Sequence, residues 1–155
     1  MKKQRITISK PGKVELVVPF GKEGEEVEVT GIIRADKKGD YELNVVCDHT
    51  APRSFGRVKI RGIAKNGANI RVNGLIKIRA EAQGVEDFLE MKLLILDDKS
   101  SAVAEPKLEI EANEVKASHA ATVGRISEEE LFYLESRGIM RKEAEEMIVK
   151  GFLRI

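Results

Sequence analysis

The sequence predicts a mainly β protein that ends in two short helices. Three observations support this prediction: segments in which apolar and polar residues alternate, turn-forming residues between them, and a helix-capping pattern near the end of the chain. Alternation with a period of two buries one face of a strand and leaves the other in water. The chain has 155 residues, 42% of them hydrophobic, which suits one folded core.

The alternating segments occupy most of the chain before residue 117. The four clearest are residues 27–30, 58–61, 76–79 and 108–111. Turn formers lie between such segments at residues 36–40, Asn66-Gly67, Asn73-Gly74 and Asp97-Asp98. This spacing is typical of a β-sandwich, a β-barrel or a β-solenoid, and periodicity alone does not choose among them.

The last thirty residues predict two helices. Ser127 and Glu130 have the spacing of a capping box, in which each side chain accepts a backbone N–H at the start of a helix. Apolar residues follow at positions 131, 132 and 134, and Gly138 is a suitable helix stop. A second helix is expected from Arg141 to about residue 150, with Ala144, Met147 and Ile148 on one side. We therefore divide the chain into a β core, residues 1–124, and a helical segment, residues 125–155.

The composition argues against several classes of protein. No apolar run approaches the roughly 20 residues of a membrane-spanning helix, so we expect no membrane association. The N-terminus lacks the apolar stretch of a secretory signal. The single cysteine excludes an internal disulfide and fits a reducing cytoplasm, where we expect the protein to act.

Charge is unevenly distributed along the chain. Residues 1–80 carry 17 Lys and Arg against 9 Asp and Glu, whereas residues 81–155 carry 10 against 17. Such polarity steers partners of opposite charge to opposite ends of a molecule. The basic residues are scattered through alternating segments, and aromatic residues for base stacking are scarce in that half, which argues against nucleic-acid binding.

Few side chains suit metal binding or nucleophilic chemistry: Cys47, His49 and His119. In an extended strand Cys47 and His49 would share a face, roughly 6.6–7 Å apart. Structural zinc and iron–sulfur sites use about four Cys or His ligands, more than this chain supplies. The structural alternatives are a small buried thiol for Cys47, a hydrogen-bonded strand-end residue for His49, and a structural hydrogen bond for His119. A small metal-dependent enzyme would require all three to converge.

Other catalytic patterns are missing from the sequence. Neither a nucleophile elbow nor a complete Walker loop occurs, and the pair of Cys47 and His49 has no evident third residue to orient it. We therefore expect the protein not to be an enzyme.

The C-terminal third resembles the core of the SufB/SufD protein family. The residues that carry the resemblance are 106–112, 114–116, 118–124, 125–127, 130–134, 136–139 and 144–152. Weaker similarity extends upstream to residues 93–96, 82–83, 73–78 and 49–52. The similarity covers roughly residues 41–153, in a chain shorter than usual members of the family.

The resemblance implies a right-handed parallel β-helix followed by a short helical segment. It also implies a scaffold in the SUF system of iron–sulfur cluster assembly, paired as a homodimer or with a SufB-like subunit, that binds a SufC-type ABC ATPase. His119 matches a histidine that ligates a transient cluster or iron shared between subunits, to which Cys47 and His49 are further candidates. The residues that match the ATPase-docking segment are Leu131, Phe132, Tyr133, Arg137 and Gly138.

Three positions depart from the family's patterns: Met91 and Ala120 from that of SufB, and Ala117 from that of many members. Met91 stands at the position of a ligand cysteine, Ala117 at that of a cysteine before the Ser-His pair, and Ala120 at that of a glutamate after the histidine. By these positions the chain is closer to SufD, the supporting subunit. The alternative is a degenerate structural or interaction module that keeps the fold without cluster chemistry.

Overall fold

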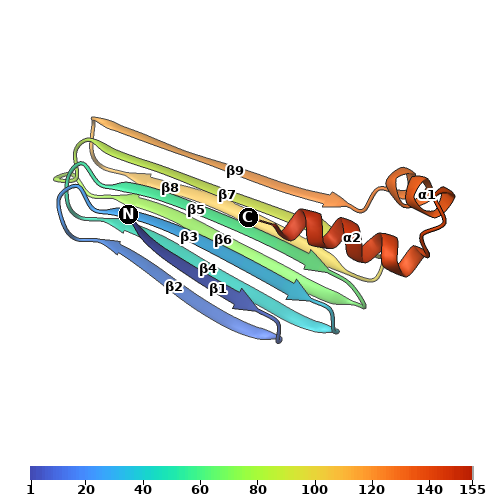
Figure 1. Ribbon diagram of the computed structural model, residues 1–155. Coiled ribbons are helices and arrows are strands. Elements are labelled where there is room, and N and C mark those ends of the chain that lie inside the picture. The colour runs from blue at the N-terminus through green and yellow to red at the C-terminus, as the bar shows by residue number, and fades with distance from the viewer. Residues whose placement is uncertain (155) are drawn as a thin grey trace.

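The computed structural model describes residues 1–154, which form nine strands and two helices (Figure 1). The strands are β1 (Lys2–Ile8), β2 (Gly12–Phe20), β3 (Glu26–Ala35), β4 (Gly39–His49), β5 (Phe55–Ala64), β6 (Ala68–Ile78), β7 (Val85–Ile95), β8 (Ser101–Ile110) and β9 (Val115–Arg125). The helices are α1 (Glu128–Ser136) and α2 (Arg141–Leu153).

The strands form a β-solenoid of about four turns, which confirms the mainly β class and the coiled parallel architecture. Odd-numbered strands form one sheet, in the order β1-β3-β5-β7-β9, and even-numbered strands form a second, in the order β2-β4-β6-β8. Every pairing is parallel. Phe55 lies beside Glu86 and Val85 beside Val115, so one coil takes about 30 residues, as in other repeat folds.

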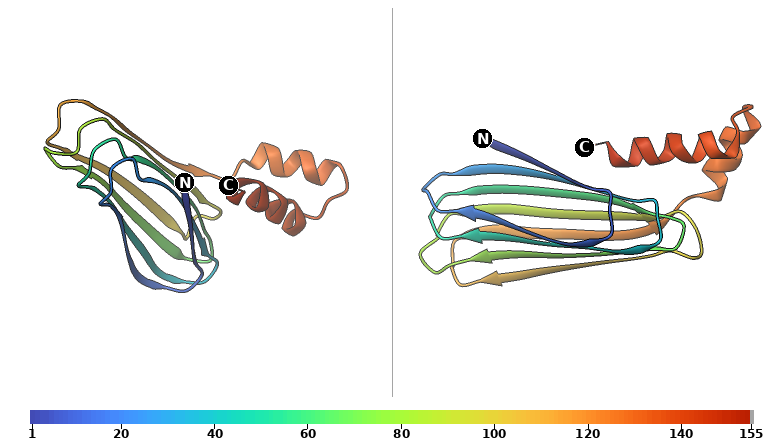
Figure 2. Two further views of the ribbon diagram at one scale, coloured as in Figure 1. Left: turned by 60° about the vertical axis from the view of Figure 1, so that its left-hand side comes forward. Right: turned by 90° about the horizontal axis from the view of Figure 1, so that it is seen from below.

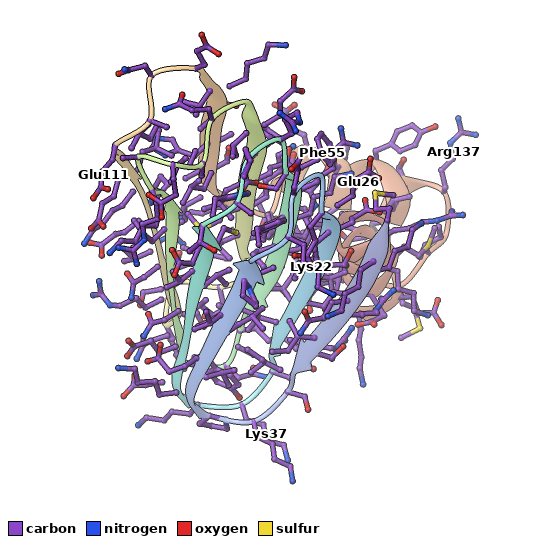
Figure 3. The ribbon with its side chains drawn as sticks, turned by 90° about the vertical axis from the view of Figure 1, so that its left-hand side faces the viewer. Lys22, Glu26, Lys37, Phe55, Glu111 and Arg137 are labelled. Atoms are coloured by element: carbon purple, nitrogen blue, oxygen red, sulfur yellow. The ribbon has the colours of Figure 1, made fainter. Side chains whose placement is uncertain are left out.

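The core lies between the two sheets. In β4, β6 and β7 buried residues alternate with partly exposed ones, so each strand presents one face to the interior. Most inner-face residues are aliphatic, and the register places like positions of successive coils side by side, as with Leu43 beside Val72. Figure 3, viewed nearly along the strands, shows the charged side chains fanning outward from this core.

The first helix begins and ends as the sequence predicts. The Ser127 hydroxyl accepts the backbone N–H of Glu130 at 3.2 Å, which satisfies one of the free donors at the start of α1. After α1 the chain passes through Gly138, whose φ of +84° is a left-handed conformation that favours glycine. The N–H groups of Gly138 and Ile139 then donate to the carbonyls of Glu135 and Leu134, which is the Schellman arrangement.

The second helix lies alongside the outer face of the odd-numbered sheet, while α1 projects beyond the strand ends (Figure 2). A small apolar cluster joins α2 to the sheet: Ile32, Ile63, Leu96, Val149 and Leu153. Arg34 of β3 donates to both Glu146 oxygens at 2.9 and 2.8 Å, and Lys65 reaches Glu145 at 3.3 Å. The helix is therefore attached by packing and by ion pairs.

Two local predictions were wrong. The buried side of α2 is formed by Ala144, Val149 and Leu153, whereas Met147 is 51% exposed, because the sheet contacts the C-terminal half of the helix through a different face. The pair Asn73-Gly74 lies inside β6 and not in a turn. A Cβ at position 74 would approach the Leu89 side chain to 2.4 Å, so this glycine makes room for the facing sheet.

Acid should weaken the attachment of α2. The Arg34 guanidinium, by hydrogen bonding, holds the pKa of Glu146 below its usual range. A carboxyl with a lowered pKa in the folded state stabilises the fold above its unfolded pKa, and that contribution is lost as the pH falls below about 4.3. We expect Glu146→Gln to lower the melting temperature modestly near neutral pH and to match wild type at low pH.

Melting curves of the full chain across the acid range measure this difference. Glu143→Gln is the matched control, since Glu143 is exposed on the same helix and has no ion-pair partner within residues 1–154. A difference in melting temperature between wild type and Glu146→Gln that stays constant down to low pH would contradict the prediction.

Candidate functional site: the open end and the helical hairpin

The solenoid has an open end at its last coil. Within residues 1–154, β8 pairs only with β6 and β9 only with β7, so each sheet ends in a strand with a free backbone edge. Apolar residues on the inner face of this coil are exposed, since no further coil covers them: Leu108 at 37%, Ile110 at 41% and Val123 at 42%. Free strand edges and apolar side chains together favour association with another chain.

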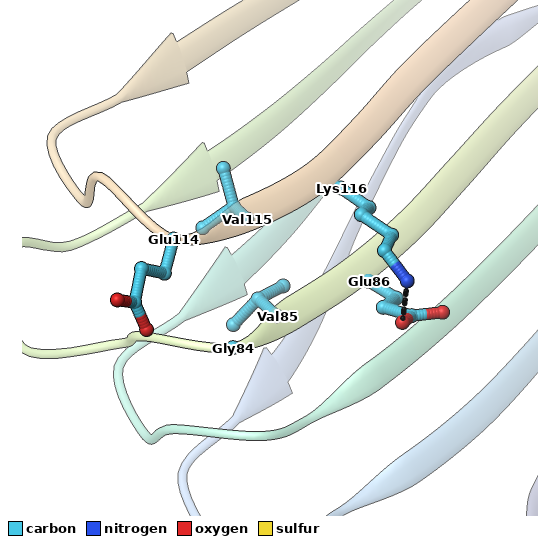
Figure 4. A pocket seen from close by; sticks show the side chains of 6 residues that line it. All are labelled: Gly84, Val85, Glu86, Glu114, Val115 and Lys116. Carbon is cyan, nitrogen blue, oxygen red and sulfur yellow. Dashed lines mark hydrogen bonds and ion pairs between the residues drawn. The ribbon is translucent and has the colours of Figure 1, made fainter.

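His119 lies on this open end. It is placed beside Leu89 by the β7–β9 register, on the inner face of β9, yet its side chain is exposed. Within residues 1–154 its ring has no hydrogen-bonding partner, so the structure does not give it the structural role that was the alternative. A hollow of about 360 Å³ lies at the start of the same strand, where Lys116 pairs with Glu86 at 2.9 Å (Figure 4).

The helical hairpin displays a second apolar surface. Phe132 is 73%, Tyr133 57% and Met140 70% exposed, and a shallow groove of about 630 Å³ runs between the two helices. The groove is lined chiefly by Tyr133, Leu134, Ile148 and Phe152, together with two glutamates of α1. Large exposed apolar side chains gathered on one small unit are typical of a docking surface.

The remaining predicted docking residues have different places in the hairpin. Leu131 is buried, at 1% exposure, and therefore supports α1 from within. Arg137 donates to the Tyr133 hydroxyl at 3.2 Å, and its guanidinium lies 5.3 Å from the centre of the same ring. Gly138 forms the Schellman turn described above. Arg137 orients the exposed tyrosine, and Gly138 sets the direction in which the chain leaves α1.

Cys47 and His49 lie elsewhere, fully buried on the inner face of β4. His49 Nδ1 is 2.7 Å from Ser54 Oγ and Nε2 is 2.8 Å from Asp87 Oδ2, while the ring stacks on Phe20 with centroids 3.9 Å apart. Both ring nitrogens are thus engaged. Burial, followed by the charge of Asp87, raises the pKa of the Cys47 thiol and keeps it protonated.

Asp87 and Ser54 were missed by the sequence analysis. Asp87 approaches His49 from the other sheet, and Ser54 approaches it from the turn after β4. Asp87 is 38 residues away in sequence and reaches the ring only because of the length of a coil. Gly56 shows how tightly this cluster is enclosed, since a Cβ there would lie 2.5 Å from the Asp87 carboxyl carbon. Met91, which departs from the resembled ligand pattern in the prediction above, is also buried, at 0% exposure.

The structure does not bring the three candidate ligands together. Within residues 1–154 no three Cys, His, Asp or Glu side chains are grouped so as to hold a metal ion. The metal-dependent enzyme, which required Cys47, His49 and His119 to converge, therefore has no assembled site in the described chain. In the same part of the chain, neither helix combines the length and the apolar character needed to cross a membrane.

These features define a class of protein: a β-solenoid with an open, apolar coil at one end and a helical hairpin that presents aromatic side chains. Residues 9–152 match the family described as "SUF system FeS cluster assembly, SufBD core domain". The chain belongs to this family.

Two curated relatives support the same family assignment. The iron–sulfur cluster assembly SufBD family proteins of Staphylococcus aureus (strain USA300) and Staphylococcus epidermidis are each 34% identical to this chain over 131 residues. The match covers 84% of this chain but 28% of either relative. The chain thus spans little more than a quarter of the length of these relatives.

Proposed function

We propose that this chain is a non-enzymatic scaffold of SUF-system cluster assembly, which pairs through its open solenoid end and docks a SufC-type ABC ATPase on its helical hairpin. One observation carries the proposal: the last coil of the solenoid and the helical hairpin both expose apolar side chains that a folded domain ordinarily covers. We assign its action to the cytoplasm, in keeping with its single buried cysteine.

Pairing through the last coil follows from the free edges of β8 and β9. A second chain that adds its own edge strand would satisfy the unpaired backbone groups and cover Leu108, Ile110 and Val123. With a second copy, a two-fold axis would place the same patch on both partners and bring two His119 rings to one interface. A SufB-like subunit would supply cysteine or carboxylate ligands in place of the second copy.

Docking of the ATPase follows from the hairpin. Phe132 and Tyr133 are large and aromatic, the residue class that dominates the energy of protein interfaces. Affinity capture with the cognate SufC-type ATPase tests this, and light scattering of the pure chain tests the pairing. We expect a stable complex and a dimer mass. A monomer that fails to capture the ATPase, where a longer relative captures it, would refute the proposal.

His119 is proposed to bind iron or a transient cluster at the shared interface. We expect His119→Ala to fold normally, since the ring is exposed, and to retain several-fold less iron after anaerobic reconstitution, because an imidazole ligand is lost. Iron content and visible absorbance measure the effect. Ser118→Ala is the control, since Ser118 is an exposed neighbour on the opposite face of β9.

The second candidate function is a degenerate module that keeps the fold and both surfaces but binds no cluster. Buried Met91 favours it, because a thioether that no solvent reaches cannot replace a ligand thiolate. Protein purified without oxygen separates the two functions. Wild type and His119→Ala with equally little iron would support the degenerate module, while capture of the ATPase would be unchanged.

A further inference from the structure

Gly151 is a glycine that the fold of this chain does not require. It lies exposed in the last turn of α2, its backbone is not left-handed, and a Cβ there would meet no neighbouring heavy atom within 4 Å. Other glycines make room for a facing side chain, which a Cβ would approach closer than 3.0 Å: Gly31, Gly56, Gly62 and Gly74. Since glycine destabilises a helix relative to alanine, folding alone would favour alanine at position 151.

The position of Gly151 indicates what the missing side chain is for. Together with Ile148 and Phe152 it lines the groove of about 630 Å³ between the two helices, and Tyr133 and Leu134 line the same groove from α1. The spacing of three and four residues places Ile148, Gly151 and Phe152 on one face of α2. Gly151 therefore leaves a stretch of bare helix backbone on an otherwise apolar wall, which lets a partner's side chain approach closely.

Two carboxylates give the groove a charge as well as a shape. Glu129 and Glu130 line it from α1, both are exposed, and neither forms an ion pair within residues 1–154. In contrast, Glu128 and Glu135 on the same helix are both paired with Arg141. An occupant that carries a cation beside an apolar side chain is complementary to the groove, whereas an acidic occupant is repelled.

We infer that the groove receives a large apolar side chain of the SufC-type ATPase, seated against the backbone at Gly151, with a lysine or arginine of the ATPase beside Glu129 and Glu130. The inference rests on the proposed docking of the ATPase on the hairpin, and adds the chemistry of the contact and the residue that admits it. Gly151 is thus a specificity-determining position, because any side chain there occupies space that the partner fills.

Calorimetry of the full chain with the cognate SufC-type ATPase tests the role of Gly151. We expect Gly151→Ala to bind about fivefold or more weakly, and Gly151→Leu more weakly still, because the added atoms overpack the contact. Neither variant should melt below wild type, since both residues favour a helix and a Cβ there has free space. Gly124→Ala is the matched control: Gly124 on β9 also has free space for a Cβ, does not line the groove, and should leave affinity unchanged.

The charge of the occupant is tested by the rate of association. Replacing Glu129 and Glu130 together with glutamine should slow association several-fold at low salt, and the difference should vanish in about 1 M salt. Glu143→Gln is the control, since Glu143 is exposed on α2, lies outside the groove and has no ion-pair partner in residues 1–154.

The outcomes separate this inference from the proposed function. Wild type that binds the ATPase no better than the Gly151 variants do would overturn the inference and leave docking on the hairpin in place. A Gly151→Ala protein that melts below wild type would also overturn it, because the glycine would then serve the fold. Association that is unchanged in the double glutamine variant would overturn the cationic occupant. Wild type that does not bind the ATPase at all would overturn the proposed docking and the inference together.

Discussion

Replacing His49 with alanine is expected to lower the free energy of unfolding by about 3–5 kcal/mol, the range for truncating a large buried ring. The substitution leaves Asp87 buried without its partner, deprives Ser54 Oγ of its donor and removes the ring that stacks on Phe20 at 3.9 Å. It also opens a cavity in the core, because the ring is fully buried. Since small domains are stable by about 5–15 kcal/mol, this is a large fraction of the total.

Chemical denaturation monitored by circular dichroism measures the loss. The chain supplies a matched control in its other histidine, because His119→Ala removes an exposed ring without a hydrogen-bonding partner in residues 1–154 and should change stability by less than about 0.5 kcal/mol. If the free energy of unfolding of His49→Ala lies within about 1 kcal/mol of the wild-type value, water satisfies the polar groups around His49 and the prediction is wrong.

The contrast between the two histidines shows what a sequence pattern reveals. The expectation that Cys47 and His49 share one face of a strand was correct, because period-two geometry is local. A hydrogen-bonded residue at the strand end was one of the alternatives for His49. Alternation did not identify Asp87 as the partner. That pairing depends on the length of a coil, and the offsets between neighbouring strands differ from coil to coil, from Glu26 beside Phe55 to Asn69 beside Ser101.

The helical segment was more predictable than the core. Ser127 and Gly138 act through bonds to residues three to five positions away, so the cap and the stop could be read directly. The buried face of α2 could not be predicted in this way, because Val149 and Leu153 are buried by contact with the sheet, which the helix sequence does not reveal. The same reasoning explains Gly74: its turn-like sequence is overridden by the Leu89 side chain on the facing sheet.

The second large effect is expected at the hairpin, where replacing Phe132 and Tyr133 together with alanine should weaken capture of the SufC-type ATPase by about 30-fold or more, the result of losing interface aromatics worth about 2 kcal/mol or more. Both side chains are exposed, at 73% and 57%, so their removal should cost little stability. Tyr133 is moreover held in place by Arg137, which lowers the entropy lost on binding.

Binding measured by calorimetry against the cognate ATPase, with the melting temperature as a check on folding, tests this result. Val17→Ala is a suitable control: Val17 is 60% exposed, lies on β2 far from the hairpin in sequence, and belongs to the even-numbered sheet, which α2 does not cover. Arg137→Ala should fall between the control and the double variant, because it leaves the tyrosine in place but free to rotate. Unchanged affinity in the folded double variant would contradict docking on α1 and would indicate the open solenoid end as the docking surface.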